Sequence, residues 1–176
     1  MVTLNLPPPM SEERLAYLRS RAIDPDIASI DLEMVKMKMR EPEEGLEWNA
    51  EQIEAAEIEY KRYLTLCVKY PYPDHSIVPN KIMDTMWHYH LLDTKAYHRD
   101  CKRVFGRYFH HFPYFGLRGA EDASNLKKAF EQTKAFYLAT FGEPIDHNSA
   151  EGDCWHDCEH RCWHACSGGG GGGDDD

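Results

Sequence analysis

Cysteine and histidine recur with a regular spacing near the C-terminus, and both are side chains that bind transition metals. The residues are Cys154, His156, Cys158, His160, Cys162, His164 and Cys166. On a helix, a spacing of four places successive members of each type about one turn apart on one face. Thiolate and imidazole groups together suit zinc or copper(I). The pattern predicts a segment that binds Zn²⁺ or Cu⁺ and becomes ordered when it does so.

Two other interpretations of this segment remain open. Its cysteines could be chemically modified or form redox disulfides, or the segment could be a terminus of biased composition with no dedicated ligand. The regular period of both ligand types favours metal binding over the last of these.

A second group of chemically capable side chains lies in the middle of the chain. Its members are Asp84, His88, His90, His110 and His111. Asp84 and His88 are one helical turn apart, and a carboxylate beside a histidine orients the ring, either for a metal ion or for general-base catalysis. At most one of the adjacent His110 and His111 can join a shared site in regular backbone. A buried histidine paired with an aspartate is also an ordinary core feature, so the group could be purely structural.

The charge and the hydropathy exclude two classes of partner. The formal net charge is −10, of which residues 151–176, with seven acidic residues and one basic residue, contribute −6. Neither part of the chain has the basic stripe that nucleic acids require. No apolar run approaches a membrane span and the N-terminus lacks a signal-peptide pattern, so we expect a cytoplasmic protein with reduced thiols. In that setting, Cys67 and Cys101 are expected to be core residues.

The elements that position these residues are predicted to be helices. Asn49 and Gln52 form a capping box before a strongly amphipathic stretch. The segment 26–40 fits a strand or a helix, and its content of methionine, lysine and glutamate favours the helix. The expected helices cover a short stretch after Ser11 through Leu18, then 26–40, 50–70, 81–92 and 94–105, and a last helix that Asp122 caps and that runs to Phe141.

We therefore predict an all-α fold, a single compact bundle or array of about five to six helices. It includes an irregular aromatic-rich segment over 107–119. The expected organisation is an N-terminal arm over 1–10, a helical domain over 11–143 and a flexible Cys/His/Gly tail over 144–176.

The middle of the chain carries motifs of a known family. The stretch DTMWHYHLLDTKAY over 84–97 is followed by Asp100-Cys101, Phe105-Gly106 and HHFP over 110–113. Together with a lead-in near Trp48, these motifs resemble the glycine-rich domain-containing protein-like family, in a bacterial-type member, over roughly residues 40–142. The resemblance implies a shared fold. It also implies that Trp87, His88, Tyr97, Cys101, His110 and His111 are motif positions.

These observations favour a non-enzymatic protein that binds or handles transition metals, with the tail as ligand segment and the helical body as scaffold. One alternative is a metal-dependent enzyme with its site around Asp84, His88, His90 and His110. Another is an interaction module whose cysteine-repeat tail is the substrate of a modifying partner enzyme.

Overall fold

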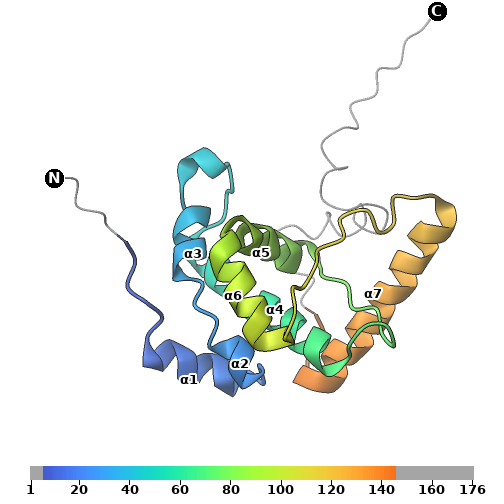
Figure 1. Ribbon diagram of the computed structural model, residues 1–176, viewed down its shortest axis with the longest axis horizontal. Helices are drawn as coiled ribbons and strands as arrows, with labels where there is room; N and C mark the ends of the chain where they lie inside the picture. The colour runs from blue at the N-terminus through green and yellow to red at the C-terminus, as the bar shows by residue number, and fades with distance from the viewer. Residues whose placement is uncertain (1–5, 146–176) are drawn as a thin grey trace, which may run out of the picture.

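The structure is a computed structural model that describes residues 6–145, and within this range it is helical and contains no strand (Figure 1). The predicted all-α class is confirmed. The elements are α1 (Glu12–Ser20), α2 (Pro25–Ala28), α3 (Glu33–Met39), the 3₁₀ helix η1 (Pro42–Glu44), α4 (Ala50–Lys69), α5 (Lys81–Leu92), α6 (Thr94–Phe105) and α7 (Ala120–Phe141).

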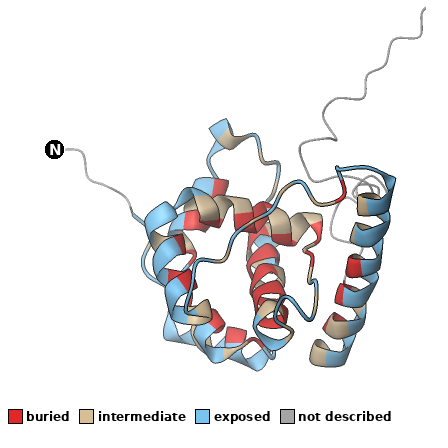
Figure 2. Cartoon of the chain, turned by 45° about the vertical axis from the view of Figure 1, so that its right-hand side comes forward, coloured by how far each residue is buried: buried red, intermediate tan, exposed pale blue. Residues whose placement is uncertain are grey.

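Helix α4 organises the fold, because α2, α3, α5 and α7 all pack against it. Its N-terminus has the predicted capping box: the Asn49 side chain accepts the Gln52 N–H, and the Gln52 side chain accepts the Asn49 N–H. Most residues in the middle of α4 are buried, and Figure 2 shows this buried stripe between the surrounding helices.

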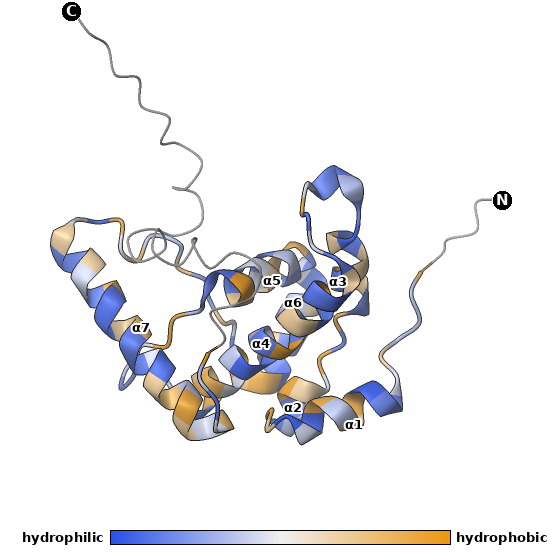
Figure 3. Ribbon diagram, turned by 180° about the vertical axis from the view of Figure 1, so that it is seen from behind, coloured by the Kyte–Doolittle hydropathy of each residue, from blue (hydrophilic) through white to orange (hydrophobic). Residues whose placement is uncertain are grey.

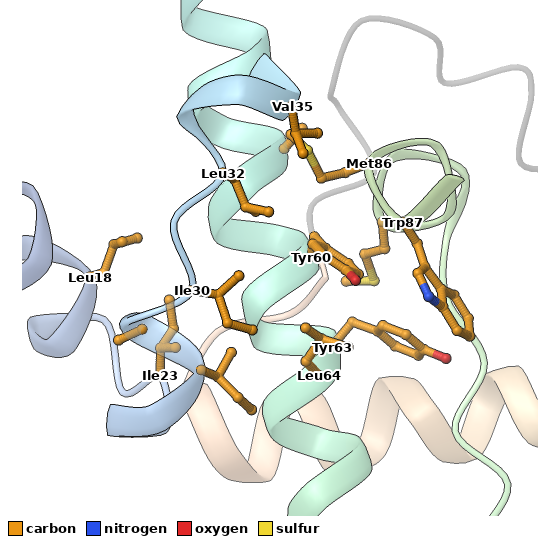
Figure 4. Close-up of a cluster of buried hydrophobic side chains, with 14 of the residues drawn as sticks. Leu18, Ile23, Ile30, Leu32, Val35, Tyr60, Tyr63, Leu64, Met86 and Trp87 are labelled. Atoms are coloured by element: carbon orange, nitrogen blue, oxygen red, sulfur yellow. The ribbon is translucent and has the colours of Figure 1, made fainter. Parts of the chain in front are cut away.

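The hydrophobic core forms on two sides of α4 (Figure 4). Ile30 and Leu32 approach it from the N-terminal segment, whereas Met86 and Trp87 approach it from α5. Burial of these apolar groups removes surface from water, which is the main force that holds the helices together. Ile145 is also part of this core, with 2% of its surface exposed.

The segment 26–40 is helical as favoured, but it forms two helices instead of one, which brings the number of α-helices in the described range to seven. The chain between the two helices is held by the buried ammonium of Lys61. That group donates hydrogen bonds to the carbonyl oxygens of Ala28 and Ile30, at 3.1 and 2.7 Å. These bonds give a partner on α4 to carbonyls at the end of α2 and just beyond it, where the helical ladder supplies none.

Capping residues set both ends of α6. Asp93 caps its N-terminus by accepting the Ala96 N–H, and Gly106 ends it with a φ of 68°. The predicted N-cap of the last helix, Asp122, is wrong, since Gly119 is the N-cap and α7 begins at Ala120. Asp122 instead accepts hydrogen bonds from the N–H groups of Gly116 and Arg118, which lie in the preceding segment.

Hydrophilic and hydrophobic residues are interspersed along the labelled helices (Figure 3). Within residues 6–145, none of the helices combines the length and apolar character needed to cross a membrane. The predicted arm and tail lie largely beyond the described residues.

Candidate metal site

Three side chains that the sequence singled out come together at one point of the fold. Asp84 and His88 lie four residues apart on α5, and His111 comes from the irregular segment between α6 and α7. One possible ligand atom from each residue lies within 4.8 Å of the others. The helical period brings Asp84 and His88 together, whereas the path of the chain after α6 brings His111 to them.

The carboxylate of Asp84 lies between the two imidazole rings. Its Oδ1 is 2.8 Å from Nε2 of His111, and its Oδ2 is 3.7 Å from Nε2 of His88. The centroids of the two histidine rings are 4.7 Å apart. Two ligands at normal zinc distances and a tetrahedral angle are about 3.3 Å apart, so small side-chain movements would complete a metal site.

The site is partly buried and its third member is firmly positioned. The side chains of Asp84, His88 and His111 are 15%, 26% and 11% exposed. The His111 ring packs on the indole of Trp87, with centroids 4.3 Å apart. Partial burial limits how well water can compete with these side chains for a metal ion, and it still leaves the site accessible to the ion.

A hydrogen-bonded chain holds the segment that carries His111. The Trp87 indole N–H donates to the hydroxyl of Tyr97 at 2.9 Å, and that hydroxyl donates to the carbonyl of Phe109. This chain joins α5, α6 and the residues just before His111. It explains how an irregular segment can hold a ring in place, and sequence periodicity alone does not reveal it.

Asp84 and His111 also line a large open cavity of about 1110 Å³. The C-terminal part of α4, the loop before α5, the end of α6 with the segment after it, and part of α7 supply its other walls. Any ion held by the three side chains would therefore lie beside a space large enough for an organic ligand.

The other two predicted histidines of the body do not join this cluster, although His110 also lines the cavity. His90 is 1% exposed and faces the core, where Nδ1 lies 3.0 Å from the hydroxyl of Tyr60 and Nε2 lies 3.3 Å from Asp100. His110 is exposed beside the ring of Tyr108, with centroids 4.8 Å apart. The structure thus brings His111, and not its neighbour, to the site.

The two cysteines of the body are free thiols in apolar surroundings. Cys101 is 3% exposed and belongs to the core, as expected. Burial raises the pKa of Cys67 to about 12, so this thiol stays protonated at neutral pH and is a poor metal ligand. The tail ligands predicted over 154–166 lie outside the described residues.

The three-residue site falls inside a recognised family region. A family model described as UCP032817-like matches residues 28–151, which is most of the chain. Comparisons with curated proteins and with solved structures found no match.

Proposed function

The chain belongs to the UCP032817-like family, and we propose that it binds a divalent transition-metal ion, Zn²⁺ in the first instance, through Asp84, His88 and His111. One observation carries the proposal. Two imidazoles and a carboxylate, contributed by segments 27 residues apart, place ligand atoms within 4.8 Å of one another in a partly buried site.

The donor set favours zinc over copper(I). Two imidazole nitrogens and one carboxylate oxygen match known three-ligand zinc sites, which leave a fourth position open. Copper(I) prefers the softer sulfur ligands, and the Cys/His tail offers those. The tail therefore remains a second proposed binding segment, for Zn²⁺ or Cu⁺. That proposal, like kinship with the glycine-rich domain-containing protein-like family, rests on the sequence pattern.

A metal-dependent enzyme is the second candidate function. The observation in its favour is that Asp84 and His111 form part of the wall of the large cavity. A zinc ion with an open coordination position beside such a space could polarise a bound water or a ligand oxygen. His90 would have no part in this chemistry, because it is enclosed in the core.

The test counts zinc ions bound by the full-length, reduced protein. Isothermal titration is performed on a background in which the tail thiols are replaced by Cys154→Ser, Cys158→Ser, Cys162→Ser and Cys166→Ser. We expect one zinc equivalent to remain. Asp84→Asn, His88→Ala and His111→Ala should each weaken its binding by at least tenfold, because each removes one ligand.

The matched control is His98→Ala, which removes an exposed histidine of α6 outside the site. It should leave zinc binding unchanged. Equal zinc affinity in the three site variants and the control would show that the cluster is a structural contact and not a metal site.

A further inference from the structure

The cavity beside the proposed metal site has mainly aromatic and aliphatic walls. Trp87, Phe109 and Phe105 form one side, with Trp87 and Phe109 stacked at 5.1 Å between centroids and Phe105 and Phe109 at 4.5 Å. Phe130 of α7 and Val78 of the loop before α5 contribute to other parts of the wall. Flat aromatic walls favour a ligand with an aromatic body, because rings gain from stacked and edge contacts beyond simple burial.

The charged side chains around this cavity are mostly cationic, although the whole chain carries a net charge of −10. The acidic residues of the lining are Asp84 and Glu131. The basic residues of the lining are Lys81, Arg107, Arg118, Lys127 and Lys134. Such a local excess of positive charge in an acidic protein favours an anionic ligand.

The basic side chains differ in how far they are already neutralised. Arg118 pairs with Asp122 at 2.6 Å, and Lys134 pairs with Glu131. Arg107 has no acidic group within ion-pair distance in residues 6–145, and it lies on the same irregular segment as His111. Because Arg107 also lines the cavity, its charge is available to a ligand held there.

We propose that the cavity binds an aromatic carboxylate. The aromatic body packs against the wall formed by Trp87, Phe109 and Phe105. The carboxylate lies near Asp84 and His111, and Arg107 and the other basic side chains attract it. This inference rests on the proposed function in one respect, because the carboxylate would also fill the open coordination position of the zinc ion. Carboxylate oxygen is a normal zinc ligand, so both attractions act on the same end of the molecule.

The probe is 2-naphthoate, titrated calorimetrically into the full-length protein, zinc-loaded or stripped with chelator. The comparator is 2-naphthamide, which has the same rings and no charge. We expect zinc-loaded protein to bind the carboxylate at least tenfold more tightly than the amide. Removal of zinc should weaken carboxylate binding, but the basic side chains should keep it tighter than amide binding.

Two pairs of variants locate the binding. Ser76 is exposed and lines the cavity, so Ser76→Trp should occupy the space and weaken binding at least tenfold, whereas Ser124→Trp, exposed on α7 away from the lining, should not. Arg107→Gln should weaken carboxylate binding about threefold and leave amide binding unchanged. Arg19→Gln, an exposed arginine of α1, should change neither.

The outcomes separate this inference from the proposed function. If zinc binds but the carboxylate and the amide bind equally, or Ser76→Trp and Arg107→Gln both bind like wild type, the ligand assignment is wrong and the metal site stands. If zinc does not bind but the carboxylate preference persists and is lost in Ser76→Trp, the metal site is wrong and the ligand class is supported.

Discussion

His88 and His90 show how position on a helix separates chemistry from packing. The two residues lie two positions apart on α5, so their side chains leave the helix in nearly opposite directions. His90 faces the core between Tyr60 and Asp100, and both of its ring nitrogens have partners. His88 lies at the partly exposed site beside Asp84. The same side chain thus has a structural role at one position and a proposed ligand role at the other.

Replacement of His90 should reduce stability without affecting the metal site. His90→Phe keeps a buried ring but leaves the Tyr60 hydroxyl and the Asp100 carboxylate without this partner. We expect a loss of about 2–3 kcal/mol in the free energy of unfolding, measured by urea denaturation. Zinc stoichiometry should be unchanged. His98→Phe, on the exposed face of α6, should alter neither quantity. A loss of zinc binding in folded His90→Phe would contradict the assignment.

At the scale of the elements, buried charges on α4 hold the N-terminal helices in place. The Glu57 carboxylate is fully buried and forms ion pairs with Arg14 of α1, Lys36 of α3 and Lys61 of α4, at 2.7, 3.0 and 2.8 Å. Burial by itself would raise the pKa of Glu57, but the nearby charges of Lys61 and Lys36 outweigh it and lower the pKa to about 2. The group therefore stays charged when the protein is folded.

Glu57 should make stability depend on acid pH. A carboxylate whose pKa falls on folding stabilises the protein at pH values above its ordinary pKa of 4.5. This stabilisation is lost as the pH falls from 4.5 towards 2. We expect about 3 kcal/mol of the free energy of unfolding to be lost over this window. Glu57→Gln should remove that dependence and cost about 3–5 kcal/mol at neutral pH, because it leaves buried cations without their partner.

Denaturant unfolding at several pH values measures both effects. The matched control is Glu51→Gln, which changes an exposed glutamate in the first turn of α4. It should retain the wild-type pH dependence and most of the stability. If the Glu57→Gln protein loses stability in acid as steeply as wild type, the pH dependence of stability comes from a group other than Glu57.

At the scale of the whole molecule, the proposed metal sites belong to two separable parts of the chain. The site of Asp84, His88 and His111 lies in the helical body, and the Cys/His repeat lies in the tail. The body core already includes Ile145. Termination of the chain after His147 therefore removes the repeat without removing a residue of that core.

Metal content of anaerobically purified protein should distinguish the two parts. We expect the shortened chain to retain one zinc ion and to lose the remainder of the tight metal uptake, because that remainder depends on the tail thiols and imidazoles. Full-length protein with the four tail cysteines changed to serine should resemble it. If the shortened chain keeps the full metal stoichiometry, the tail does not bind the metal. If the shortened chain contains no metal, the site of Asp84, His88 and His111 is not a metal site.

Local patterns predicted most of the helices but not every boundary. The capping box at Asn49 and the bounds of the helix over 94–105 are set by residues close to each helix end, and both are present as expected. The carbonyls of Ala28 and Ile30, at the break within 26–40, bond to Lys61, which lies more than thirty residues further along the chain. Asp122 bonds to the segment before it, which capping statistics do not foresee.

The sequence by itself determined the helical class, most of the helix positions and the pairing of Asp84 with His88, because these follow from the period and the end groups of a helix. Only the tertiary structure decided that His111 joins them, that His90 serves the core, and that a cavity with basic side chains lies alongside. Those results depend on how α5, α6 and the chain after them pack together. Packing brings together residues whose separation in the sequence does not follow the helical repeat, so the sequence pattern does not predict it.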